Sequence, residues 1–145
     1  MKEDPLRAIR YFPWLLCGLL VACSPPSKIT LEAKKVASGV EVSGTTSLPD
    51  GAQFLVALRK DLSSEPICLA LPLVKGHRYR ATLKPPVLAP GRYQIRLEFS
   101  PKAFSWSNDV LPAVGKNGEK LAGPLVRDSG QGYRILEVLA PLDLP

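Results

Sequence analysis

One residue in this chain could act as a general base near neutral pH, the lone histidine His77. Histidine is the side chain most often used to move protons in catalysis. A nucleophilic serine would need a frame such as Gly-x-Ser-x-Gly, and no serine of the chain has one. His77 follows Gly76 in a turn, where we expect its ring to be solvated. We therefore expect a protein that is not an enzyme and has no catalytic residues, with a hydrolase that uses His77 as the alternative.

Motifs that bind metals, nucleotides or nucleic acids are missing from the sequence. It contains no His-Glu-x-x-His, no EF-hand loop, no Gly-x-Gly-x-x-Gly and no P-loop. The formal charge of +6 is spread along the chain, without a basic patch interleaved with aromatic residues. We expect no cofactor, no metal and no nucleic-acid partner.

Three cysteines offer thiol chemistry, and two of them, Cys17 and Cys23, lie near the N-terminus. The third, Cys68, lies alone in the apolar run 67–74, so the sequence predicts no disulfide within the domain and no thiol metal site. Cys68 is interpreted as a small buried hydrophobe. The alternative is a thiol that forms an intermolecular disulfide or a redox contact.

The first 23 residues have the composition of an export signal. An apolar run at 14–22 ends at Cys23 and is too short for a membrane-spanning helix, which needs about 20 residues. Pro25 and Pro26 prevent a helix from continuing past the cysteine. The run is preceded by the cationic residues Lys2, Arg7 and Arg10.

The stretch Leu20-Val21-Ala22-Cys23 resembles the lipobox of bacterial lipoproteins. That resemblance implies a signal peptide at 1–22, cleavage before Cys23, and a diacylglycerol on the Cys23 thiol with further acylation, such as palmitate, on the new α-amino group. The mature protein would then be anchored in the cell membrane and face away from the cytoplasm, in the periplasm or at the outer membrane where the source has two membranes. The alternatives are a plain secretory signal with an incidental Cys23, or an N-terminal helix that is never cleaved.

Behind the lipidated cysteine, residues 23–38 are predicted to form a short tether. Within it, residues 29–37 fit either a weak helical turn or a first edge strand. The rest of the chain, residues 39–145, has the length of one ordinary domain.

Period-two alternation dominates this domain and predicts a succession of short strands. The apolar run 67–74 and the strand after it are predicted to pair as a hairpin, and Asn117-Gly118 predicts another hairpin turn. With turn signals between strands and no long amphipathic helix, the pattern predicts an all-β fold, an antiparallel immunoglobulin-like β-sandwich of about seven strands. The alternating strands are expected at 40–46, 53–60, 78–84, 92–99 and 133–139.

Three stretches resemble immunoglobulin-like or fibronectin-type-III-like modules of exported bacterial proteins. They are Val42 to Gly51, the succession Leu88-Ala89-Pro90-Gly91-Arg92-Tyr93, and Gly115 to Pro124. The chain departs from antibody-type domains because it lacks their paired cysteines and a tryptophan in the third strand. The resemblance implies a fold and leaves the activity open.

Two groups of side chains are candidates for binding a partner. Arginines on the outward faces of 78–84 and 92–99 would form one basic stripe if those two strands pair, and otherwise they are a solvated sheet face. These arginines are Arg78, Arg80, Arg92 and Arg96. Phe104 and Trp106 lie in an irregular segment, where they either reach a partner from the rim of the sandwich or are buried under its end.

Together these features predict a lipid-anchored, non-enzymatic interaction module of the cell envelope. Its membrane contact would be the lipid on Cys23, and its partner an envelope protein or an anionic polymer. The alternative is a structural or assembly accessory of an envelope complex.

Overall fold

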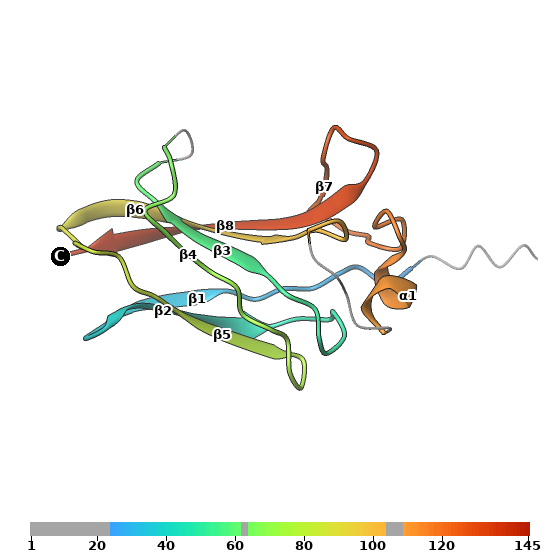
Figure 1. The fold of residues 1–145 in the computed structure, drawn as a ribbon, viewed down its shortest axis with the longest axis horizontal. Coiled ribbons are helices and arrows are strands. Elements are labelled where there is room, and N and C mark those ends of the chain that lie inside the picture. Colours follow the sequence, from blue (N-terminus) through green and yellow to red (C-terminus); the bar gives the residue numbers. More distant parts are fainter. Residues whose placement is uncertain (1–23, 62–63, 104–108) are drawn as a thin grey trace, which may run out of the picture.

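Two antiparallel sheets pack face to face in the computed structural model, which describes residues 24–61, 64–103 and 109–145. Figure 1 shows the two layers, with the C-terminus at the end of the sandwich opposite the helix α1 (Val110–Val114). The smaller sheet has the order β1 (Glu32–Val36), β2 (Gly39–Thr45), β5 (Arg78–Leu83). The larger sheet has the order β4 (Cys68–Ala70), β3 (Leu55–Arg59), β6 (Gly91–Phe99), β8 (Arg134–Leu144), β7 (Val126–Asp128). This architecture confirms the predicted all-β fold, an antiparallel β-sandwich, with eight strands in the described residues where about seven were expected.

The core lies between the sheets and follows the period-two pattern of the strands. In β6 every second residue from Tyr93 to Phe99 is buried, and the residues between them face outward. Phe54 occupies the centre, with edge-to-face contacts to the rings of Tyr79 at 4.9 Å and Phe99 at 6.5 Å between centroids. The largest fully buried side chains around it are Leu58, Leu83, Ile95, Leu97 and Leu136.

Tyr93 supplies a local signature of this class of sandwich. It lies near the start of β6, and its hydroxyl donates to the carbonyl oxygen of Ala89, four residues earlier, at 2.7 Å. A tyrosine hydroxyl that bonds back to the backbone at the entry to this strand is the tyrosine corner of immunoglobulin-like folds. The Pro90-Gly91 turn brings the two groups together.

The predicted hairpin between residues 67–74 and 78–84 is wrong. β4 pairs with β3, and β5 pairs with β2, so the chain changes sheets between them. Only the bridge between Lys75 and Arg78 remains of a hairpin. Alternation identifies a strand and its two faces but not its neighbour, and here the crossover brings each edge strand to a different sheet.

The hairpin predicted at Asn117-Gly118 is also wrong. The segment before it ends as the helix α1, and the Asn-Gly turn packs against the start of β8, where Arg134 N donates to Asn117 O at 2.9 Å. A Cβ on Gly118 would lie 2.6 Å from the carbonyl oxygen of Arg134. Glycine is required here by close approach to β8 and by a φ of 71°, not by a turn between paired strands.

The tether predicted for 23–38 is much shorter in the structure. Ser27 N donates to Ala122 O at 2.8 Å, and Lys28 exchanges hydrogen bonds with Ser47, so the chain is docked from Ser27 onward. Of the two options for 29–37, the edge strand is the one observed, because β1 pairs with β2 over its full length. Only residues 24–26 remain between Cys23 and the docked chain.

Candidate functional site

The predicted basic stripe is not formed. β5 belongs to the three-stranded sheet and β6 to the five-stranded sheet, so their outward faces lie on opposite sides of the sandwich. Arg78 and Arg80 are therefore separated from Arg92 and Arg96. The prediction depended on β5 and β6 being neighbours, a relationship that strand alternation alone does not determine.

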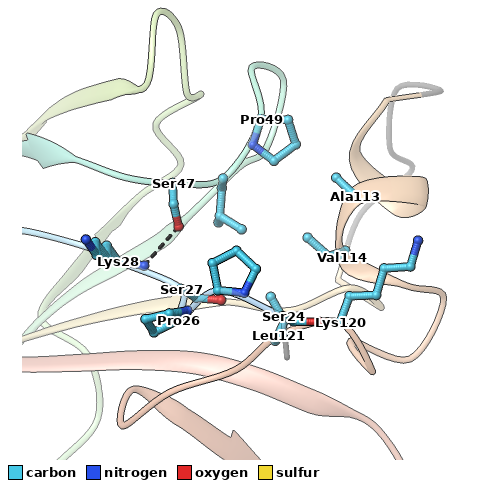
Figure 2. A pocket seen from close by; sticks show the side chains of 12 residues that line it. Ser24, Pro26, Ser27, Lys28, Ser47, Pro49, Ala113, Val114, Lys120 and Leu121 are labelled. Atoms are coloured by element: carbon cyan, nitrogen blue, oxygen red, sulfur yellow. Dashed lines mark hydrogen bonds between the residues drawn. The ribbon is translucent and has the colours of Figure 1, made fainter. Parts of the chain in front are cut away.

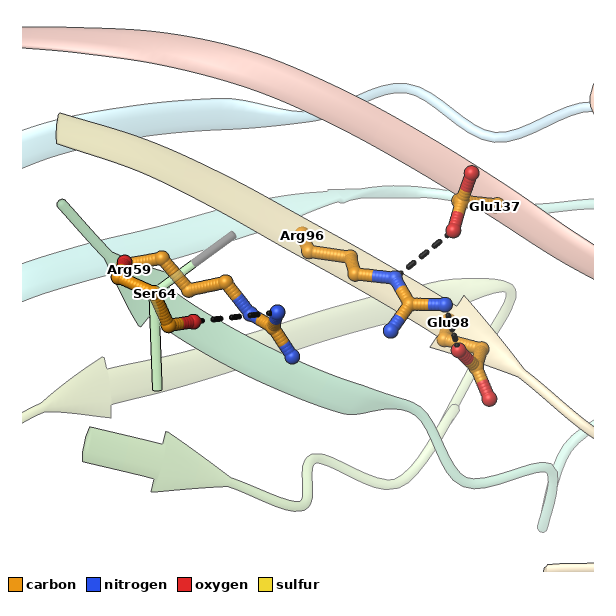
Figure 3. Close-up of polar contacts among 5 residues, drawn as sticks. All are labelled: Arg59, Ser64, Arg96, Glu98 and Glu137. Atoms are coloured by element: carbon orange, nitrogen blue, oxygen red, sulfur yellow. Dashed lines mark hydrogen bonds and ion pairs between the residues drawn. The ribbon is translucent and has the colours of Figure 1, made fainter. Parts of the chain in front are cut away.

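Arg96 is held in an ion-pair ladder on the outer face of the five-stranded sheet (Figure 3). Its Nε donates to Glu137 Oε2 at 2.7 Å across the β6–β8 pairing, and its Nη2 lies 2.5 Å from Glu98 Oε2. Only 28% of the Arg96 side chain is exposed. Two carboxylates neutralise one guanidinium, so this position does not offer a free positive charge to an anionic polymer.

Arg92 and Arg59 differ from Arg96 in their surroundings. Arg92 is 92% exposed and lies 3.4 Å from Asp143, a geometry of little energetic weight. Arg59 donates from Nη1 to the carbonyl oxygen of Ser64 at 3.4 Å, which ties β3 to the loop that leads into β4 (Figure 3). The outer face of this sheet is thus an electrically balanced surface.

Arg78 and Arg80 border a hollow of about 520 Å³ that is lined from all three strands of the three-stranded sheet. Lys75 and Leu73 also line it, together with Glu32 from β1. No ion pair links Lys75, Arg78 or Arg80 to a carboxylate within the described ranges. Asp50 lies near Lys75, and Glu41 lies near Arg80 but is paired with Lys34, so a small excess of positive charge remains around the hollow.

Three of the five exposed large hydrophobic side chains in the described structure form a row of leucines that the sequence did not single out. Leu69, Leu71 and Leu73 are 54%, 48% and 60% exposed. They lie on β4 and its continuation, at the outer edge of the five-stranded sheet. We call these three residues the leucine edge. The alternation within 67–74 was the available signal, because the smaller Cys68, Ala70 and Pro72 occupy the positions between the leucines.

The N-terminal segment enters the sandwich beside α1, as Figure 2 shows. Residues 24–28 line a cavity of about 410 Å³ together with Leu48, Pro49 and the α1 region. The Lys28 amide donates to Ser47 Oγ at 2.9 Å. The described chain therefore enters the sandwich at the end that carries α1.

His77 serves the turn before β5. Its amide donates to Asp50 Oδ1 at 3.1 Å, and its ring Nδ1 lies 3.1 Å from the carbonyl oxygen of Leu48, which can only accept. Nδ1 is therefore the protonated ring nitrogen. Hydrogen bonds from the backbone amides of Gly76 and His77 lower the pKa of Asp50. The hydrogen bonds of His77 with Asp50 and with Leu48 thus hold the loop 47–52 against the turn 75–77.

Cys68 is half-buried on β4 and is a free thiol. Burial raises its pKa, which disfavours the reactive thiolate. Burial also raises the pKa of Tyr79, whose hydroxyl donates to Thr30 O at 2.6 Å.

The remaining predicted site residues, Cys23, Phe104 and Trp106, lie outside the described residues, as does the predicted signal peptide at 1–22. Within the described ranges no three His, Cys, Asp or Glu side chains gather where they could hold a metal ion. No helix in that part of the chain is long and apolar enough to cross a membrane.

The fold and these surfaces define an antiparallel β-sandwich with a leucine-lined edge. Comparison with known proteins found no matching family model and no matching curated protein.

Proposed function

We propose that this protein is a lipid-anchored, non-enzymatic interaction module of the cell envelope that binds another protein through its five-stranded sheet. The anchor would be the lipid on Cys23, as the stretch Leu20-Val21-Ala22-Cys23 suggests. The partner would be an envelope protein, met on the side of the membrane away from the cytoplasm.

The observation that carries the choice of a protein partner is the leucine edge beside a neutralised sheet face. Large apolar side chains exposed in a contiguous row are typical of protein-binding surfaces. Arg96, one of the cations that favoured an anionic polymer, is paired with Glu98 and Glu137. A face without excess charge suits a protein better than a polyanion.

The docking of Ser27 supports an anchored domain that stands close to its membrane. Four peptide units separate Cys23 from Ser27, and an extended chain of that length spans at most about 14 Å. A lipidated Cys23 would therefore hold the α1 end of the sandwich at the membrane surface. The leucine edge, on the flank of the sandwich, would stay open to a partner beside it.

The anchor and the binding activity are tested separately. Mass spectrometry of the mature N-terminus is expected to find a triacylated or diacylated Cys23, and a Cys23→Ser variant is expected to leave the membrane fraction. An unmodified Cys23 in membrane-bound protein would contradict the anchor. For binding, cells carrying a photo-crosslinking residue in place of Leu71 are expected to yield a discrete protein adduct. The matched control carries the photo-crosslinking residue in place of Val87, an exposed apolar side chain that is not part of the leucine edge.

A further inference from the structure

The leucine edge carries backbone amides without hydrogen-bond partners in the described residues, as well as apolar side chains. β3 and β4 pair with Val56 opposite Ala70 and Leu58 opposite Cys68, and the same register continues to the bridge between Gln53 and Leu73. Phe54 N donates to Pro72 O at 3.0 Å, and Val74 N to Ala52 O at 2.7 Å. Even-numbered residues of this edge therefore direct their backbone groups toward β3.

In an antiparallel pair, the residues between hydrogen-bonded pairs turn their N–H and C=O groups the other way. Those residues are Leu69, Leu71 and Leu73, and none of their amides has a hydrogen-bond partner within the described ranges. The Leu71 carbonyl oxygen accepts from Gln53 Nε2 at 3.1 Å. Pro72, which has no N–H, lies at a position that faces β3 and so does not interrupt the open side.

Proteins usually protect such an edge with lysines, prolines or a covering loop, because an exposed apolar edge recruits another strand. Here the three open positions carry leucine instead of lysine. We infer that the leucine edge is a strand-addition site: an extended segment of the partner protein pairs with residues 69–73 and extends the five-stranded sheet. This inference rests on the proposed function and specifies how the partner is bound.

The charges at one end of the edge define the chemistry of that segment. Leu73 adjoins the hollow bordered by Lys75, Arg78 and Arg80, and Glu32 lines the same hollow. Asp50 lies near Lys75, and Glu41 lies near Arg80 but is already paired with Lys34 at 3.0 Å. The excess of positive charge favours a segment with acidic residues beside Leu73. Antiparallel addition, the more stable ladder, places those acidic residues at the N-terminal end of the segment.

A second copy of this chain fits less well. Antiparallel pairing of two identical edges requires a two-fold axis perpendicular to the strands, so the two sandwiches run in opposite directions. Two domains that stand on one membrane with their α1 ends down cannot adopt that arrangement. Self-association is therefore kept as a contrary outcome of the experiment.

The test uses the full chain purified in detergent and a synthetic probe peptide with two N-terminal glutamates followed by alternating valine and threonine. Hydrogen exchange of the unmodified protein is expected to slow at least tenfold at Leu69, Leu71 and Leu73 when the peptide is added. No change at these three amides, or an equal change elsewhere, would overturn the inference. Protection that depends on protein concentration without peptide would overturn it in favour of pairing between copies.

Variants then test the backbone and the charges by fluorescence anisotropy of the labelled peptide. Leu71→Pro removes one open N–H and is expected to weaken binding at least tenfold, whereas Val87→Pro leaves it unchanged. Arg78→Glu is expected to weaken binding of the peptide with two glutamates and to strengthen binding of a peptide that carries two lysines in their place. Equal affinities for both peptides would refute the assigned chemistry. If the crosslink from position 71 persists while the probe fails in every assay, strand addition is wrong and the interaction module still stands.

Discussion

Arg96 on β6 and Glu137 on the neighbouring strand β8 form an ion pair on the outer face of the larger sheet, with 2.7 Å between Arg96 Nε and Glu137 Oε2. Glu98 approaches the same guanidinium from along β6. The Arg96 guanidinium therefore pairs with two carboxylates, each of them about four-fifths buried. This relationship makes Arg96 a structural residue of the sheet.

We expect Arg96→Gln to lower the free energy of unfolding by about 1–2 kcal/mol, because two largely buried carboxylates lose their shared cation. Arg92→Gln is the matched control and should change it by less than about 0.5 kcal/mol, since its pair with Asp143 is exposed. Urea denaturation of both variants measures the difference. Equal losses in the two variants would show that the ion pairs of Arg96 with Glu98 and Glu137 contribute no more to stability than the exposed pair of Arg92.

The tyrosine corner gives a second prediction. Tyr93→Phe removes the hydroxyl that donates to Ala89 O and should lower the free energy of unfolding by about 1 kcal/mol, the usual weight of a part-buried hydrogen bond. Tyr133→Phe is the control, because its hydroxyl makes only a 3.4 Å exposed contact with Gln131. Urea denaturation should therefore separate the two variants, and a Tyr93→Phe protein as stable as the parent would contradict the assigned role.

Much of this fold could be predicted from alternation, and the reason is visible in β6. Its buried residues from Tyr93 to Phe99 repeat with a strict period of two, which a half-buried strand requires. The partner of a strand is set by long-range packing, so the pattern could not show that β4 joins β3 or that β5 joins β2. The predicted basic stripe failed for the same reason.

The candidate site was harder to predict because its signal depends on that pairing. Leu69, Leu71 and Leu73 look like core residues in a run as apolar as 67–74. Small residues and leucines alternate along the run, but the register with β3 is needed to show that Pro72 and Val74 are buried and the leucines exposed. Likewise, the Asn117-Gly118 pair signals a turn correctly, while the helix before it rules out a hairpin.

Acid should destabilise the loop that Asp50 joins to the turn 75–77. Its pKa is lowered from 3.8 in the folded protein by hydrogen bonds from the amides of Gly76 and His77. A carboxyl whose folded pKa is lowered contributes stability above its unfolded pKa and loses it as pH falls through the folded value. Asp50→Asn keeps an acceptor but cannot titrate, so its free energy of unfolding should depend less on pH below about pH 4. Unchanged pH dependence in urea titrations would count against this hydrogen-bonded arrangement.

Cys68 should react slowly as a thiol. Burial raises its pKa, so less thiolate is present near neutral pH and alkylation is disfavoured. We expect iodoacetamide at pH 8 to modify Cys68 at least tenfold more slowly in the folded protein than in urea, with the site assigned by peptide mass spectrometry. Rapid modification of the folded protein would support the alternative of an accessible thiol that contacts another molecule.

Gly44 should be the position at which the N-terminal segment is most easily detached from the sandwich. A Cβ there would lie 1.9 Å from the carbonyl oxygen of Thr30 and 2.8 Å from Tyr79 Oη. Gly44→Ala must therefore displace Thr30 and break the 2.6 Å hydrogen bond from Tyr79, at an expected cost of about 2–3 kcal/mol in the free energy of unfolding.

The control for this substitution is Gly130→Ala, which meets nothing within 4 Å and bears only the strain of a φ of 75°. Its expected cost is about 1 kcal/mol. Hydrogen exchange provides the decisive readout, because the Thr30 amide donates to Thr45 O and should exchange faster in Gly44→Ala alone. A domain freed in this way would stand farther from a lipid on Cys23, since the docked contacts of Ser27 and Lys28 lie on the same segment. If Gly44→Ala left exchange at Thr30 unchanged, the docking of residues 27–31 would not depend on the close approach that excludes a side chain at Gly44.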